Sequence, residues 1–338
     1  MHVRRRVRRT VWATVWVTLA LGVVVFPVAQ AGAGSDDDAE ALLAYSRRVG
    51  ANETFAGVVE VRWADEAGEE QVVRVGARSV RGRFVVGVAE HHFIGQGFER
   101  FTTSAGDVDA RWIEGQGGAP PPPGESWDLE IGRHREVAGR EATVVVARDD
   151  DGHVRARFAI DRERGQLLRR EVLDRHGRVV HSVGFVKIVI GSITPAVPAT
   201  PKDAPAAPEA LDTAPGGYLA PDEIDGYRLL GVYQHADGLM QMYYGDGVFT
   251  LSLFEQTGTI DWESLPIGGA DVADLRDRAY VTAVGTVVVW QQGELVCTIV
   301  GDGPRDVVAK AVADLAGIND DSWLDDVGDF LLGPFSWK

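Results

Sequence analysis

The sequence lacks the residues and motifs on which most enzyme classes depend. Its 338 residues include one cysteine, Cys297, so no intramolecular disulfide can form. It has no G-x-S-x-G, G-x-x-x-x-G-K-[ST] or G-x-G-x-x-G pattern, which hydrolases, P-loop proteins and dinucleotide-binding proteins carry. Cys297 stands among Leu295, Val296 and Val300, which favours a buried, inert thiol. We therefore expect no catalytic residue and no enzymatic activity.

The eight histidines form no metal-binding pattern. His91 and His92 are adjacent, so on a strand they point to opposite faces. The DDDG stretch at residues 149–152 resembles a calcium loop only in part, because Ala147 stands where the first acidic ligand belongs. The remaining candidates are scattered over expected strands and turns: His134, His153, His176 and His181. The sequence therefore predicts no metal and no cofactor. A general acid/base pair among the many carboxylates can be chosen only once the fold is known.

The N-terminus has the pattern of an export signal. Basic residues 4–9 precede an apolar run over residues 11–26, and Ala29 and Ala31 have the spacing of a cleavage site. We expect a signal peptide over residues 1–31, with an uncleaved membrane anchor as the alternative. The rest of the chain then carries 29 basic and 50 acidic residues, a net charge of −21, which argues against nucleic acid as a partner. Either way, we expect the protein outside the cytoplasm, in the periplasm or cell envelope.

Residues 35–193 are predicted to form a first domain of one helix and many antiparallel strands. A short amphipathic helix is expected over residues 35–50, ended by Gly50. Period-two alternation predicts strands at 55–64, 71–80, 82–89, 105–115, 141–149, 153–161, 166–174 and 178–191. Four prolines make residues 117–125 an exposed loop. Val154, Ala156, Phe158 and Ile160 are expected on one buried face, and Arg155 and Arg157 on the solvated one.

A Pro/Ala-rich linker is expected over residues 194–217, followed by a second domain over residues 218–338. This domain should hold a hairpin at 239–256, a strand at 279–293, a strand at 294–302 and a helix at 303–317 that starts at Pro304. An acidic, aromatic tail follows. In the hairpin, Gly245-Asp246-Gly247 should form the turn, and Phe249, Leu251 and Leu253 should face the core. Phe254 would then lie on the more polar face, or be turned inward by a β-bulge.

Several pieces, in order, resemble one known family. "VAGREA", "FAIDRERGQLLRREVLD" and "GFVKIVIG" lie within residues 135–191, and "GYRLLGVYQHADGLMQMYYGDGVFTLSLFEQ" follows the linker. The start, "AEALLAYSRRVGANETFAGVVEV", is similar too. Over most of residues 37–315 the chain resembles the sigma-E factor regulatory proteins of the RseB/MucB type. The "RARFAID" strand, the proline loop and the tail depart from the pattern, which leaves the partner's identity open.

The resemblance implies an α+β protein: a LolA-like curved antiparallel half-barrel with helices, then a smaller α+β C-terminal domain. An apolar concave face could take a lipid or acyl ligand, lined by Val154, Ala156, Phe158, Ile160 and Phe185, or its own helix could fill it. The implied function is an exported, non-enzymatic regulator. It would bind the extracytoplasmic part of a membrane anti-sigma factor, control its proteolysis, and release it when lipid binds.

Two further expectations accompany this function. The candidate partner-binding residues are Tyr244, Asp246 and Phe254 on the outer face of the hairpin. The alternative function is an extracytoplasmic lipid or lipoprotein carrier. A homo-oligomer is left open.

Overall fold

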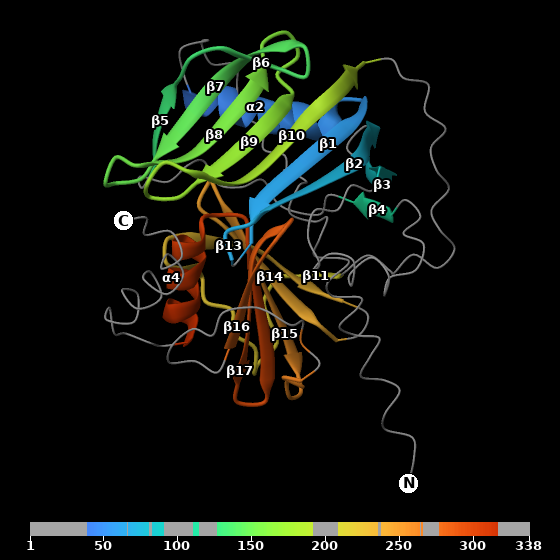
Figure 1. Ribbon diagram of the computed structural model, residues 1–338. Helices are drawn as coiled ribbons and strands as arrows, with labels where there is room; N and C mark the ends of the chain where they lie inside the picture. Colours follow the sequence, from blue (N-terminus) through green and yellow to red (C-terminus); the bar gives the residue numbers. More distant parts are fainter. Residues whose placement is uncertain are drawn as a thin grey trace.

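The computed structural model describes residues 39–65, 67–80, 83–90, 111–114, 127–191, 209–235, 238–263, 265 and 277–316. These residues form two antiparallel sheets, each with one helix packed against it (Figure 1). The expected signal, the proline loop, the acidic tail, and His91 and His92 lie outside the described residues. Among the described helices, none has the length and apolar character that crossing a membrane requires.

The first sheet is built almost as the alternation predicts. Within the described residues it has ten strands in the order β4-β3-β2-β1-β10-β9-β8-β7-β5, with β6 paired to β7. The strands are β1 (Phe55–Ala64), β2 (Glu70–Val80), β3 (Arg83–Glu90), β4 (Arg111–Glu114), β5 (Asp128–Ile131), β6 (Arg135–Val137), β7 (Arg140–Arg148), β8 (Val154–Asp161), β9 (Leu167–Leu173) and β10 (Val179–Ile190). The pairing of β1 with β10 joins the two ends of this part of the chain into one open, curved sheet.

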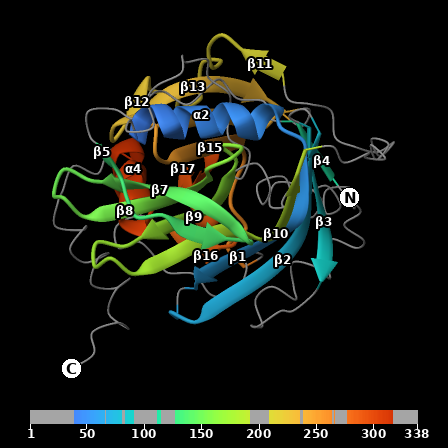
Figure 2. The same cartoon turned by 90° about the horizontal axis from the view of Figure 1, so that it is seen from above.

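Helix α2 (Ala39–Asn52) covers one face of the first sheet. Figure 2 shows it crossing the sheet, which bends between β9 and β1. Leu43 and Ala39 share a hydrophobic core with Val145 and Phe158. Gly50 was expected to end the helix, but the helix runs two residues further to Asn52. This correction is small, because helix ends vary by a residue or two.

The second sheet also consists of antiparallel strands. Within the described residues its order is β11-β13-β14-β15-β18-β17-β16, with β12 paired to β13. Its strands are β11 (Glu209–Leu211), β12 (Glu223–Ile224), β13 (Tyr227–Gln234), β14 (Met240–Gly245), β15 (Thr250–Thr257), β16 (Asp277–Thr282), β17 (Gly285–Gln292) and β18 (Leu295–Gly301).

The prediction of a mostly antiparallel α+β protein is confirmed: the described residues form two antiparallel sheets and the helices α2 and α4.

Two expectations about this sheet are wrong. Residues 279–293 were expected to form one strand, but Gly285, with φ of 122°, lets the chain turn and form the β16–β17 hairpin. The Pro/Ala-rich segment was expected to be linker as far as Gly217, but its residues 209–211 form β11, which pairs with β13. A short edge strand of this kind has too little alternation to show in the sequence.

Helix α4 (Arg305–Ala316) packs against the second sheet through its predicted face. Val308, Ala311 and Val312 are buried there, next to Phe249 and Leu251 of the hairpin. Pro304 lies one residue before the helix and its carbonyl accepts hydrogen bonds from the N–H groups of Val307 and Val308. The helix therefore starts one residue later than expected.

Candidate functional site

Charged side chains join the two sheets where β9 meets the segment between β18 and α4. Arg170 of β9 forms an ion pair with Asp302, with Nη1 2.6 Å from Oδ2. Both side chains are more than nine-tenths buried. The guanidinium also donates to the Val248 carbonyl and lies 5.3 Å from the centre of the Phe249 ring. Asp302 in turn accepts the Thr250 N–H at 2.7 Å, so one buried ion pair ties β9 to the end of β18 and the start of β15.

A second ion pair depends on a bulge that the sequence did not reveal. The β7–β8 register shifts between Ala147 and Arg148, so Arg155 is left as the extra residue of β8. A bulge re-aims a side chain. Arg155 was expected on a solvated face, but it is buried, and its Nη2 lies 2.7 Å from both carboxylate oxygens of Asp306 in the first turn of α4. Burial opposes the charge of Arg155, but Asp306 and Asp149 outweigh burial and raise its pKa.

Two further contacts complete what we call the intersheet contact: Arg47, Arg155, Arg170 and His181 on the first side, and Gly247, Ala283, Asp302 and Asp306 on the second. Arg47 of α2 donates to the Gly247 carbonyl. Burial, then the nearby charge of Arg170, lowers the pKa of Arg47 to about 10. The Nε2 of His181 lies 2.9 Å from the Ala283 carbonyl, and burial lowers the pKa of His181 to about 4. His181 is therefore a neutral donor at physiological pH.

The turn of the β14–β15 hairpin lies against this contact. Asp246 accepts the N–H groups of Val248 and Phe249 at 2.7 and 2.6 Å, and burial raises its pKa to about 6. The indole of Trp127, which precedes β5, packs edge-on to Phe249 with ring centres 5.2 Å apart. The hairpin therefore meets the first sheet through its turn, rather than presenting its outer face to solvent.

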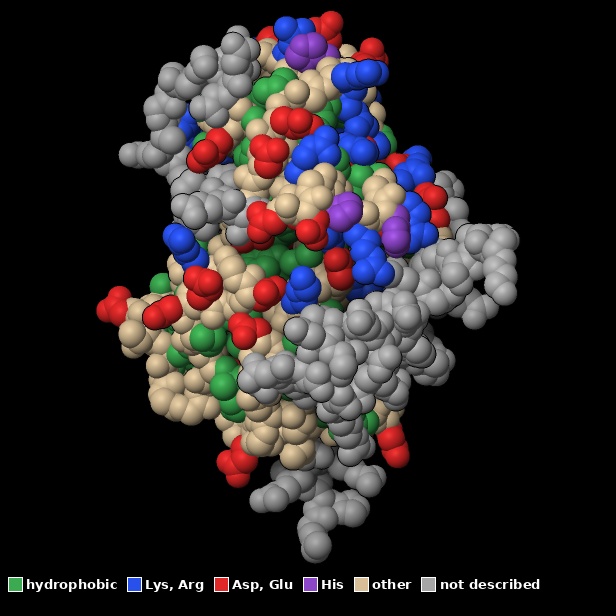
Figure 3. Space-filling model, turned by 90° about the vertical axis from the view of Figure 1, so that its left-hand side faces the viewer, with side chains coloured by type: hydrophobic (Ala, Val, Ile, Leu, Met, Phe, Trp, Pro, Cys, Tyr) green, Lys and Arg blue, Asp and Glu red, His purple; other side chains and the backbone are tan. Residues whose placement is uncertain are grey.

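The intersheet contact combines buried apolar side chains with ion pairs between the two sides. Leu43 and Phe158 of the first side and Tyr227 and Phe249 of the second belong to one buried cluster. Buried ion pairs contribute little net free energy, because desolvation offsets much of their attraction, yet removing one partner is costly. Figure 3 shows basic side chains gathered over the first sheet, interspersed with acidic ones. Such a contact can hold two units in one arrangement and still be opened by a competing ligand.

The candidate lipid-pocket residues do not line one interior. Ala156, Phe158 and Ile160 are fully buried in the core beneath α2. Val154 and Phe185 belong to a second cluster, in which Phe185 packs edge-on to Phe55 at 5.5 Å. The five candidates therefore belong to two buried clusters rather than one. Whether any of them contacts a lipid stays a prediction.

The candidate partner-binding residues are not exposed. Tyr244 is fully buried on the core face, where burial raises its pKa, and Phe254 is 6% exposed. Ile260, Trp262 and Leu265 cover the outer face of the hairpin, in the same cluster as Phe254. The Ile260 N–H donates to Gln291 and holds this cover in place. The apolar spacing at residues 260, 262 and 265 was the signal that could have predicted it.

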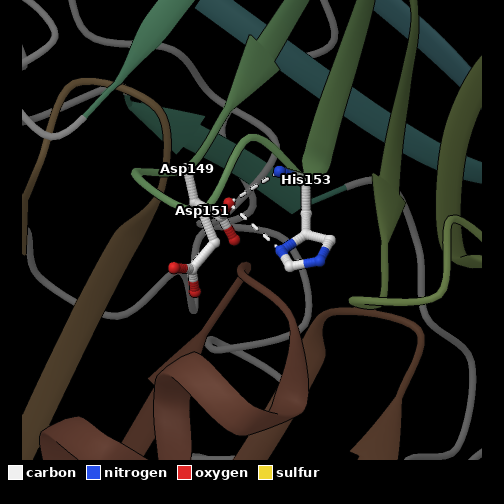
Figure 4. A group of neighbouring side chains, drawn as sticks. All are labelled: Asp149, Asp151 and His153. Carbon is white, nitrogen blue, oxygen red and sulfur yellow. Dashed lines mark hydrogen bonds and ion pairs between the residues drawn. The ribbon is translucent and has the colours of Figure 1, made fainter.

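One turn gathers groups that could ligate a metal. Figure 4 shows Asp149, Asp151 and His153 together on the turn between β7 and β8. Their ligand atoms all lie within 4.8 Å of one another. Asp149, however, already accepts the His153 N–H and pairs with Arg155 at 3.0 Å. A cation would have to compete with that guanidinium, so the turn is explained by its own hydrogen bonds.

The comparisons with known proteins agree with the resemblance in the sequence. The family model for the MucB/RseB N-terminal domain matches residues 83–209. A crystal structure of MucB is 17% identical and has a TM-score of 0.50, covering 84% of this chain and 98% of that one. A Pseudomonas aeruginosa MucA/MucB complex is 18% identical with a TM-score of 0.45, covering 82% and 97%. A LolA superfamily protein from Nitrosomonas europaea is 8% identical with a TM-score of 0.20, covering 78% and 91%.

No curated protein matches the sequence. The MucB structure shares the fold of this chain over nearly its whole length, and the family model matches from β3 to the start of β11. Residues 83–209 therefore match the MucB/RseB N-terminal domain family, and the chain shares the fold of MucB.

Proposed function

We propose that this protein is an exported, non-enzymatic regulator that binds the extracytoplasmic segment of a membrane anti-sigma factor. In doing so it controls proteolysis of that factor during envelope stress. The family match over residues 83–209 carries this proposal. One structure of the relative MucB is described as a complex with MucA(peri), which is the kind of partner we propose here.

The intersheet contact suggests how partner binding could be regulated. A ligand shifts a protein between two arrangements only by binding one of them more tightly. Here the candidate arrangements are the sheets joined, with Arg170 on Asp302 and Arg155 on Asp306, and the sheets apart. We propose that the anti-sigma segment binds one arrangement and that a stress ligand favours the other.

A lipid is the proposed stress ligand. The face of the first sheet beneath α2 is apolar, and α2 fills it with Leu43 in the joined arrangement. An acyl chain that took the place of Leu43 would move α2, and Arg47 on α2 would then lose its hydrogen bond to the hairpin turn. In this scheme lipid entry and loosening of the intersheet contact are one event.

Photo-cross-linking in the source organism tests the proposal. A photoreactive residue would be placed at exposed Arg162, with a second at exposed Glu294 on the other sheet, and products would be identified by mass spectrometry. We expect a membrane anti-sigma factor among the products. Recovery of lipids or lipoproteins alone, with no anti-sigma factor at either position, would favour the carrier function instead.

A further inference from the structure

The open edge of the second sheet is covered by a short strand of the Pro/Ala-rich segment. β11 contributes three pairs to β13: Glu209 with Gln234, Ala210 with Tyr233, and Leu211 with Val232. Glu209 and Ala210 are exposed, and only Leu211 packs against the core. The cover is therefore held by a few backbone contacts and one apolar side chain.

Apart from its cover, the stretch of β13 at residues 232–234 lacks the usual protection of a sheet edge. Edge strands avoid unwanted pairing through lysine, proline, bulges or a covering segment. Residues 232–234 of β13 contain neither lysine nor proline, and Val232 and Tyr233 are only 3% and 8% exposed with β11 in place. Removing β11 would leave apolar side chains beside unpaired backbone groups, which is the usual setting for strand addition.

The covering segment packs on the core through Leu211 and Ala214 and ends at a pair of glycines. We call residues 209–217 the edge flap. It ends at Gly216 and Gly217, where a Cβ would meet no atom within 4 Å and Gly217 has φ of 98°, so the chain can hinge there. Immediately after it, the Leu219 N–H donates to the buried carboxylate of Glu255 at 2.8 Å. This hydrogen bond anchors the chain to β15 whether or not the flap is paired.

We infer that the edge of β13 accepts an extended segment of a partner polypeptide in place of the edge flap. The flap shows what fits: a strand antiparallel to β13, with an apolar residue opposite Val232 to replace Leu211. Main-chain hydrogen bonds supply affinity in such additions, and the apolar position supplies selectivity. The identity of the partner, the extracytoplasmic anti-sigma segment, rests on the proposed function. The existence of the site does not.

A peptide with the flap's own sequence tests the site. The probe is a fluorescein-labelled peptide of residues 207–213, and binding is read by anisotropy. The vacated variant carries Glu209→Gly, Ala210→Ser and Leu211→Gly. The locked variant is E209C/Q234C, oxidised to a disulfide between two exposed residues that face each other across the strands. The matched controls are the single variant E209C and a peptide carrying Leu211→Asp.

We expect the vacated variant to bind the peptide at least tenfold more tightly than the unmodified protein, whose own flap competes. The oxidised lock should show no binding, and reduction should restore it. The Leu211→Asp peptide should bind the vacated variant at least tenfold more weakly. Equal binding to the locked and vacated proteins, or none to a folded vacated variant, would overturn the inference.

Hydrogen exchange on the unmodified protein keeps the test decisive if the vacated variant fails to fold. We expect the amides of β11 to exchange at least tenfold faster than those of β15. Protection of β11 equal to that of β15 would overturn the inference. Failure in either experiment leaves the anti-sigma proposal standing, because that proposal is tested by cross-linking to the whole partner.

Discussion

Replacing Arg170 with methionine should show how strongly the two sheets depend on their charged contact. The substitution keeps an unbranched apolar stem but removes the ion pair to Asp302, the hydrogen bond to Val248 and the cation beside the Phe249 ring. Asp302, 7% exposed, would be left as a buried charge without its partner. Removing one member of a buried pair costs about 3–5 kcal/mol, so we expect that loss in the free energy of unfolding.

The double variant R170M/D302N separates the pair from its surroundings. Asparagine keeps an oxygen that can accept the Thr250 N–H, and no unpaired charge remains. Because neutral replacements for a buried ion pair are often tolerated, the double variant should lie within about 2 kcal/mol of the unmodified protein. Its stability should therefore exceed that of R170M.

Urea unfolding followed by tryptophan fluorescence measures both variants, with the free energy extrapolated linearly to zero urea. Arg162→Met is the matched control, because Arg162 pairs with Glu141 on the surface, with side chains 50% and 81% exposed. Its cost should stay below about 1 kcal/mol. The reasoning would be refuted if R170M cost no more than R162M, or if the double variant were less stable than R170M.

Four other outcomes are expected. Burial raises the pKa of the Glu255 carboxyl from 4.5 to about 7, so the free energy of unfolding should fall as pH rises through that range. E255Q should remove about 3 kcal/mol of this fall when urea unfolding is measured against pH. A free energy of unfolding that depends on pH as before in E255Q would contradict this. Phe254→Ala should cost about 3–5 kcal/mol by the same assay, since the ring is core; a loss under about 1 kcal/mol would return it to the surface. Gly285→Ala should cost about 2 kcal/mol or more, because φ is 122° and a Cβ would stand 2.1 Å from the Gly301 carbonyl oxygen; an unchanged melting temperature would show that the backbone relaxes. Limited proteolysis should cut within the Pro/Ala-rich residues 194–217 and leave two resistant fragments, whereas first cleavage inside β7–β10 would contradict the two-domain expectation.

Most strands of the first sheet could be predicted because apolar and polar residues alternate along them. From β7 to β10 the expected bounds lie within one residue of the observed ones, since period-two alternation and glycine turns agree along this stretch. The core face of the hairpin followed from the same rule, and Phe249, Leu251 and Leu253 are all fully buried.

The intersheet contact could not be predicted, because it depends on features that alternation does not encode. The bulge at Arg155 adds one residue to β8, which turns an expected surface arginine into the partner of Asp306. The cover over Phe254, formed by Ile260 and Leu265, shows in the sequence only as an apolar spacing, which does not reveal the surface that it covers. Both features arise when distant segments meet, and a single sequence does not show which segments will do so.

Proteolysis of the anti-sigma segment, with and without this protein, measures directly whether the protein protects it. The purified extracytoplasmic segment of the source organism's membrane anti-sigma factor would be incubated with its regulated protease, with and without this chain, and its half-life followed. We expect at least tenfold slower cleavage when the chain is present, and loss of that protection in R170M but not in R162M. An unchanged half-life with saturating, folded protein would contradict it.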